Sequence, residues 1–167
     1  GWAKLPADTP LGPTLGGVAI DRAGLVYVST DGPSGVLVFS ADGKFIRSIA
    51  KEFSGIHGLT IREEGGREFI YAAHLKGNQV VKLDLDGVAQ WTIGVAMESG
   101  LYKEKKDFKP TAFAVGPDGR IGAPANAGNA GENPAGRTGG RARTAVARSG
   151  RRPHVAARLG VISARRR

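Results

Sequence analysis

Two copies of one sequence pattern, about 40 residues apart, constrain the fold of this chain more than any other feature. The segment Gly17-Val18-Ala19-Ile20 corresponds to Gly58-Leu59-Thr60-Ile61 at an offset of 41. Val26-Tyr27-Val28 then corresponds to Ile70-Tyr71-Ala72, and Asp42-Gly43 to Asp86-Gly87, both at an offset of 44. The three extra residues lie in the first turn of the second copy, where insertions are tolerated. A repeat of this length indicates stacked structural units.

Each copy predicts four short strands. They span residues 17–20, 25–29, 35–40 and 45–50 in the first copy, and 58–61, 68–73, 79–85 and 88–93 in the second. The two early strands are nearly continuous apolar runs and are expected to be buried on both faces, whereas the last strand alternates like an edge that meets water. The Asp-Gly pairs suit tight hairpins, because glycine adopts positive φ at no steric cost. Such units stack radially, which predicts an all-β fold, a partial β-propeller of four-stranded antiparallel blades.

A third copy begins at Thr111 and loses the pattern after Ile121. Gly122 stands at the position of Tyr27, and Pro124 falls where the second strand should close, although proline cannot donate to a strand ladder. We therefore divide the chain into a lead-in (1–11), propeller blades (12–121) and a tail (122–167). Within 12–121 the predicted blades are 12–53, 54–97 and a partial 108–121.

The net charge of +9 lies entirely in the tail. Residues 1–119 carry nine Lys and four Arg against fourteen acidic residues, whereas residues 120–167 carry eleven Arg against the single acid Glu132. The tail also lacks aromatic residues and a periodic apolar face, and its Gly/Ala/Pro content predicts disorder. The abrupt change favours a frameshifted or spliced-on origin over a basic arm selected to bind nucleic acid.

The two full copies resemble NHL-repeat β-propellers. The resemblance covers about residues 12–121 and is carried by segments 16–29, 57–84 and 110–121. Such propellers usually have six blades, so the resemblance implies that this chain is the front part of a bacterial six-bladed protein. An open stack of two blades would expose apolar sheet faces and unpaired edges, so we expect a truncated chain to self-associate. Within the group, the sequence is similar to propellers related to the peptidyl-hydroxyglycine amidating lyase, which hold a metal with histidines near the central channel.

That similarity implies a divalent-metal site at His57, which opens the first strand of the second copy. His74 follows the second strand, at the position of Thr30, and is expected on the same rim as a candidate second ligand. The alternative for both is a histidine whose ring is hydrogen-bonded to backbone. Gly16 and Thr111 occupy the positions equivalent to His57, so no second ligand of that kind is present in the other copies. Asn78 and the Asp31-Gly32-Pro33 segment read as turn formers.

Three function classes remain open. The first is a scaffold that binds a protein or small-molecule ligand on the propeller face, without intrinsic catalysis. The second is the remnant of a metal-dependent, lyase-like or hydrolase-like enzyme, and the third is nucleic-acid or acidic-partner binding through the Arg-rich tail. The absence of Cys excludes disulfides and thiolate metal sites. No signal peptide or membrane-spanning run is visible, so we expect no membrane partner, and the compartment is not determined.

Overall fold

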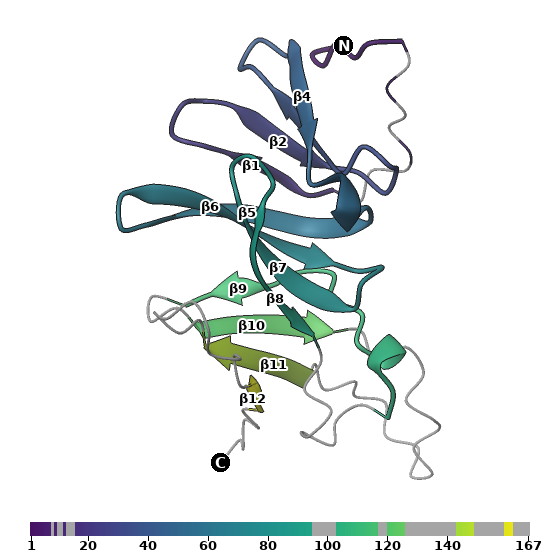
Figure 1. Ribbon diagram of the computed structural model, residues 1–167, viewed down its shortest axis with the longest axis vertical. Coiled ribbons are helices and arrows are strands. Elements are labelled where there is room, and N and C mark those ends of the chain that lie inside the picture. The colour runs from purple at the N-terminus through teal and green to yellow at the C-terminus, as the bar shows by residue number, and fades with distance from the viewer. Residues whose placement is uncertain are drawn as a thin grey trace.

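The protein is an all-β stack of three four-stranded antiparallel sheets, as seen in a computed structural model (Figure 1). The structure describes residues 1–7, 9, 12, 16–94, 103–116, 120–125, 143–148 and 159–161. For residues 120, 123–125, 143–148 and 159–161 it describes the backbone alone. No helix in this described part of the chain has the length and hydropathy to span a membrane.

The first sheet has the strand order β1-β2-β3-β4, and the second has the order β5-β6-β7-β8. Their strands are β1 (Val18–Ile20), β2 (Val26–Ser29), β3 (Val36–Phe39), β4 (Phe45–Ile49), β5 (Ile56–Glu64), β6 (Arg67–His74), β7 (Gln79–Asp84) and β8 (Ala89–Gly94). All eight strands predicted from the repeat are present. The hairpin glycines Gly43 and Gly87 have φ values of 84° and 89°, which explains why glycine recurs at this place in both copies.

A third sheet, with the order β12-β11-β10-β9, corrects the expectation for the tail. It contains β9 (Ala114–Val115), β10 (Arg120–Ala125), β11 (Arg143–Arg148) and β12 (Leu159–Val161). Pro124 lies within β10, opposite Thr144 of β11. Two tail segments thus take the places of the outer strands, because backbone hydrogen bonds can complete a sheet without the apolar pattern of the repeat. The rest of the tail lies outside the described residues, so its predicted disorder stays a prediction.

The sheets pack flank against flank, and the two flanks of each sheet differ. We call the flank that carries Tyr27 in the first sheet and Tyr71 in the second the tyrosine flank, and the opposite one the aliphatic flank. The tyrosine flank of the first sheet meets the aliphatic flank of the second in one buried core, whose members are Tyr27, Val36, Val38, Ile49, Ala50, Phe53, Ile56, Leu59, Ile70, Ala72, Val81 and Leu83. The tyrosine flank of the second sheet faces the third sheet, and the ring of Tyr71 lies 6.3 Å from that of Phe113.

The first strand of the stack departs from the expected burial on both faces. Val18 and Ile20 of β1 are 56% and 63% exposed, while Ala19 between them packs against the core. The physical reason is that only one flank of the first sheet has a neighbouring sheet among the described residues.

Short connections join the sheets. The 3-10 helix η1 (Lys51–Phe53) leads from the first sheet to the second, and η3 (Lys105–Asp107) precedes the third. At the outer strands, Arg47 of β4 donates to the backbone oxygen of Leu85 and to Asp86 Oδ1, both at 3.1 Å. The sheets are therefore held together at their outer as well as their inner strands.

Candidate functional site

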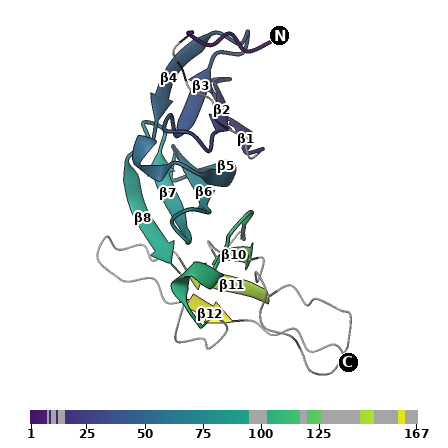
Figure 2. The same cartoon turned by 90° about the vertical axis from the view of Figure 1, so that its right-hand side faces the viewer.

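The inner strands β1 and β5 lie on one side of the stack, and the outer strands β4 and β8 lie on the other (Figure 2). The inner strands approach one another closely where glycine opens each repeat. A Cβ atom on Gly17 would lie 2.7 Å from the His57 carbonyl oxygen, and one on Gly58 would lie 2.9 Å from that of Thr111. Glycine at these positions therefore permits backbone contact between consecutive sheets.

His57 occupies a β-bulge at this inner edge. The pairs Ile56–His74 and Leu59–Ala72 differ in register, so His57 and Gly58 together lie opposite Ala73. Bulges redirect side chains and are frequent next to functional sites. His57 is half-buried at this bulge, which the repeat did not predict.

The backbone of His57 is engaged, whereas its ring is available. Its carbonyl oxygen accepts a hydrogen bond from Ser29 Oγ at 3.2 Å, and Ser29 Oγ in turn accepts one from Gly17 N at 3.1 Å. The His57 ring has no hydrogen-bond partner among the described residues. Its imidazole can therefore contact a ligand without first breaking an internal bond.

His74 is placed differently, because the protein uses both of its ring nitrogens. Nε2 donates to the Ser54 carbonyl oxygen at 2.9 Å, and Nδ1 accepts from Gln79 Nε2 at 3.1 Å. The ring is 7% exposed and packs edge-on against Phe53 at 5.4 Å. Burial lowers the pKa of His74, and the positive charge of Lys76 lowers it further, despite the opposing hydrogen bond to Ser54. This geometry matches the backbone-bonded alternative.

The described residues contain no group of three or more His, Asp and Glu side chains arranged to hold one metal ion. Whether His57 and His74 share a metal therefore remains a prediction. His74 of β6 pairs with Ile56 of β5, and His57 is the next residue along β5.

The turn beside His74 is anchored to the first sheet and to the segment that precedes the third. Asn78 has a φ of 53°, which confirms it as a turn former, and its Nδ2 donates to the Phe108 carbonyl oxygen at 2.5 Å. Lys76 Nζ lies 2.8 Å from Asp31 Oδ1 of the first sheet. The rim of the second sheet that carries His74 is thus built mainly from structural contacts.

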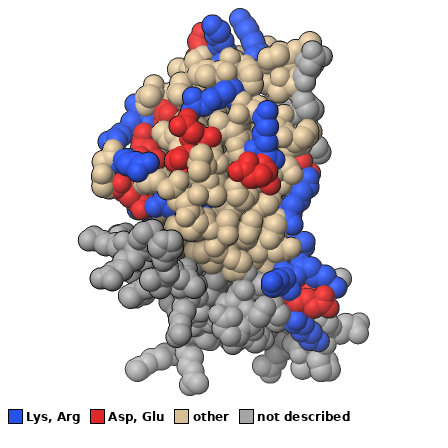
Figure 3. Space-filling view, viewed as in Figure 1, with Lys and Arg blue, Asp and Glu red and all other residues tan. Residues whose placement is uncertain are grey.

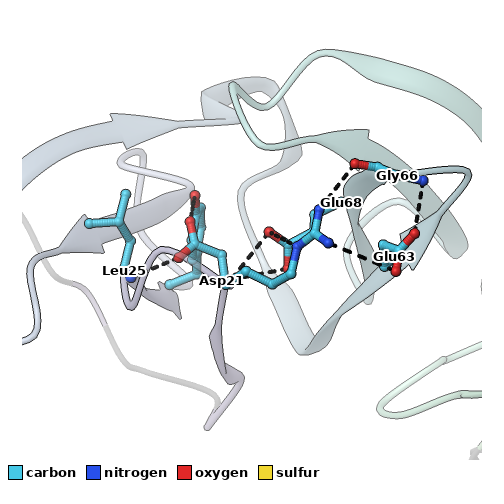
Figure 4. A network of polar contacts seen from close by, with 7 residues as sticks. Asp21, Leu25, Glu63, Gly66 and Glu68 are labelled. Carbon is cyan, nitrogen blue, oxygen red and sulfur yellow. Dashed lines mark hydrogen bonds and ion pairs between the residues drawn. The ribbon is translucent and has the colours of Figure 1, made fainter.

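Figure 4 shows a polar network that joins the first turns of the two sheets. Arg22 N donates to Glu68 Oε1 at 3.1 Å, Arg22 NH2 donates to the Gly66 carbonyl oxygen at 3.0 Å, and the guanidinium lies 3.9 Å from Glu63 Oε2. Glu63 and Gly66 belong to the longer first turn of the second copy, and Glu68 lies at the start of the strand that follows it. The longer turn thus contributes to binding the first sheet. The repeat alignment located this insertion but did not predict its partner.

Asp21 anchors the buried end of the same network. Its carboxylate accepts hydrogen bonds from Leu25 N at 2.8 Å and from the Tyr27 hydroxyl at 3.1 Å. Burial and the adjacent Asp21 carboxylate raise the pKa of Tyr27, so the phenol stays protonated and donates. These contacts stabilise the turn.

The second sheet repeats this theme with different residues. The Tyr71 hydroxyl donates to Glu64 Oε1, and Lys82 Nζ lies 2.7 Å from Glu64 Oε2 and 4.0 Å from the centre of the Phe69 ring. Burial alone would raise the pKa of Glu64, but the hydrogen bonds from Lys82 and Tyr71 and the charge of Lys82 lower it on balance. Sequence reasoning missed this cluster. The available signal was Lys82 at the position of the apolar Val38 in the first copy.

The surface in Figure 3 carries acidic and basic side chains close to one another around a broad uncharged area. This distribution agrees with the near-neutral balance of residues 1–119.

Comparison of the sequence with protein-family models and with curated protein sequences finds no match. Solved structures do share the arrangement of sheets. Selenomethionine-substituted virginiamycin B lyase from Staphylococcus aureus has a TM-score of 0.53 and 17% identity, and the match covers 83% of this chain and 39% of that one. A catalytically inactive, histidine-to-alanine variant of the lyase with quinupristin has a TM-score of 0.58, 15% identity and coverages of 96% and 44%. Streptogramin B lyase has a TM-score of 0.56, 14% identity and coverages of 86% and 40%.

The fold is a partial β-propeller. The three sheets are blades of that propeller, and β1, β5 and β9 are their inner strands. At 14–17% identity the similarity establishes the fold alone, and the chain spans about two fifths of the length of these lyases.

Proposed function

We propose that this chain is part of a ligand-binding β-propeller, and that a protein or small-molecule ligand contacts its inner strands at His57. The observation that carries the proposal is the placement of the His57 ring. It lies half-buried in a bulge of an inner strand, with no hydrogen-bond partner among the described residues. Small-molecule sites commonly occupy the mouths of β-structures, where a few polar groups orient the ligand.

The surrounding geometry supports a preformed site. Ser29 fixes the backbone of His57, and the close approach of Gly17 and Gly58 to neighbouring strands holds the bulge between the first and third sheets. Ligand binding would therefore involve little backbone rearrangement, which preserves affinity.

The test is a titration with quinupristin, which is bound in one of the similar lyase structures. We expect the imidazole NMR signals of His57 to shift with saturation, while those of His74, whose nitrogens are both hydrogen-bonded, stay in place. His57→Ala should weaken binding at least about tenfold, the loss of roughly one oriented polar contact. Val88→Ala, on an exposed β7–β8 turn, is the matched control. Binding that is unchanged by His57→Ala, or absent altogether, would contradict a quinupristin-type ligand at this site.

A metal-dependent lyase activity is the second candidate. It is favoured by the histidine at the inner strand and by the similar lyase that is inactive when a histidine is replaced by alanine. It predicts that Mg²⁺, Mn²⁺ or Zn²⁺ binds, as measured by calorimetry, and that His57→Ala abolishes the binding. A catalytic metal usually needs three protein ligands, so absence of any uptake removes this candidate.

Binding through the Arg-rich tail is a separate proposal. It rests on the eleven arginines of residues 120–167. It predicts strongly salt-dependent binding of a DNA oligonucleotide that disappears when the chain ends at Ile121. Binding that survives this truncation would exclude the tail as the binding element.

A further inference from the structure

The segment that leads into the third sheet is extended, and burial alternates along it. Phe108 has φ −82° and ψ 106°, the values of extended backbone. Phe108 and Pro110 are buried, whereas Lys109 and Thr111 are half-buried. Since side chains alternate along an extended chain, Lys109 and Thr111 lie on the same side of this segment.

This segment lies beside His57 at the inner edge of the stack. A Cβ atom on Gly58, the residue after His57, would lie 2.9 Å from the Thr111 carbonyl oxygen. The same kind of contact joins the first two sheets, where a Cβ atom on Gly17 would lie 2.7 Å from the His57 carbonyl oxygen. His57 and Thr111 therefore hold equivalent places on neighbouring inner strands.

Lys109 also has an equivalent in the second copy of the repeat. Lys109 precedes Thr111 by two residues, as Gly55 precedes His57. Gly55 has no side chain, and Lys76 fills the space beside it, since a Cβ atom on Gly55 would lie 2.6 Å from Lys76 Cγ and Cδ. That lysine is neutralised, because Lys76 Nζ lies 2.8 Å from Asp31 Oδ1.

Lys109, in contrast, forms no ion pair with any residue that the structure describes. The acidic residues nearest to it in sequence are used elsewhere. Asp107 Oδ2 accepts a hydrogen bond from Glu104 N at 2.9 Å, and Glu104 Oε2 lies 2.7 Å from Lys106 Nζ. A half-buried ammonium group without an acidic partner favours the binding of an external anion, because burial of an unpaired charge is costly.

Two uncharged hydrogen-bond donors belong to the same part of the rim. Within the described part of the chain, the Thr111 hydroxyl has no hydrogen-bond partner, and neither does the His57 ring. Lysine, threonine and histidine side chains all carry donors, and an oxyanion accepts several hydrogen bonds at once.

We propose that Lys109, Thr111 and His57 form a binding site for an oxyanion, the carboxylate or phosphate group of a ligand. Lys109 supplies the charge, and Thr111 and His57 supply directed hydrogen bonds. This inference rests on the proposed function, because it names the chemical group that the ligand presents at His57.

NMR titration of the full chain with acetate and with inorganic phosphate, each at constant ionic strength, tests the site. We expect the signals of the His57 imidazole, the Lys109 side chain and the Thr111 amide to shift together and to saturate at millimolar concentration. Acetamide, the uncharged analogue of acetate, should leave them in place. Saturation by acetate alone would assign the site to a carboxylate, and saturation by phosphate alone would assign it to a phosphate group.

Lys109→Met should raise the dissociation constant of the bound anion about tenfold or more, because it removes the charge and keeps an unbranched side chain. Lys103→Met is the matched control, since Lys103 precedes the same segment, is exposed and forms no ion pair with a described residue. It removes the same charge from the protein, so it should leave anion binding unchanged if the contact with Lys109 is local. Circular dichroism identical to wild type shows that both variants fold.

Three results would each overturn the oxyanion site: no saturable shift with either anion, equal binding of acetamide and acetate, or equal losses in Lys109→Met and Lys103→Met. The quinupristin titration is a separate readout. Quinupristin binding that depends on His57, without any anion binding, would support the proposed ligand site and overturn the oxyanion site. Anion binding without quinupristin binding would support the oxyanion site and contradict a quinupristin-type ligand.

Discussion

Replacing Gly17 with alanine tests whether backbone contact between inner strands holds the sheets together. The added methyl group would lie 2.5 Å from Ser29 Oγ, 2.7 Å from the His57 carbonyl oxygen and 3.1 Å from Leu59 N. Two of these atoms belong to the backbone of the next sheet, so they can move only if the sheets separate slightly. Gly17 does not adopt positive φ, so the effect comes from space rather than from backbone conformation.

The size of the effect follows from those contacts. Overpacking a close contact costs about 1–3 kcal/mol, and displacing Ser29 weakens hydrogen bonds worth about 1 kcal/mol each. We therefore expect Gly17→Ala to lower the free energy of unfolding by about 2–4 kcal/mol. A methyl group on Gly58 would meet the Thr111 carbonyl oxygen at 2.9 Å and nothing else below 3.0 Å. Gly58→Ala should accordingly cost less, about 1 kcal/mol.

Urea unfolding followed by circular dichroism, at one fixed protein concentration, measures these differences. Gly94→Ala is the control, because no atom lies within 4 Å of its added methyl group and Gly94, like Gly17, does not adopt positive φ. It should be neutral, or more stable by about 0.5 kcal/mol because the unfolded chain loses entropy. If Gly17→Ala unfolds like Gly94→Ala, the inner strands are not in the contact described, and the packing argument for the bulge at His57 fails with it.

Three further predictions concern buried polar groups. Asp21→Ala should destabilise the fold by about 2 kcal/mol, because it leaves two donors without their acceptor. Tyr27→Phe removes one hydrogen bond and should cost about 1 kcal/mol. Equal losses in urea unfolding would argue against a carboxylate shared by Leu25 and Tyr27. Glu64→Ala should destabilise more than Lys82→Met, since it leaves a buried ammonium unpaired while methionine retains the packing on Phe69; thermal unfolding of both variants decides the order. Burial lowers the pKa of His74 below its ordinary 6.5, so the folded state binds a proton less readily than the unfolded chain. The stability that neutral His74 contributes is therefore present above pH 6.5 and is lost as the pH falls through 6.5 towards the folded-state pKa. Wild-type stability should therefore decline between about pH 7 and pH 5 more than that of His74→Gln, and parallel curves would show that His74 does not titrate on unfolding.

The candidate site was predicted only in part. Sequence reasoning selected His57 and His74 together, because both fall at strand ends on one rim of the second copy. The structure separates their roles, since the His74 ring is hydrogen-bonded to Ser54 and Gln79 whereas that of His57 is not bonded to any described residue. Ser54 precedes His74 by 20 residues, and a contact of that range has no signature in the repeat.

The sequence by itself determined the strands, the hairpins and the all-β stack. Alternation, strand length and Asp-Gly turns are local features that occur in both copies of the repeat. All eight strands predicted from them are present in the structure. Gly17 and Gly58 were also visible as repeat positions, although their purpose was not.

Only the tertiary structure decided how the sheets are joined and completed. The bond from Arg22 to Glu68, the burial of Lys82 beside Glu64, and the completion of the third sheet by residues 143–148 each join segments far apart in the chain. Such contacts depend on which side chain faces a neighbouring sheet and on which backbone edge remains unpaired. Both are set by the packing of whole sheets, because a local sequence pattern specifies a strand but not the partner that it meets.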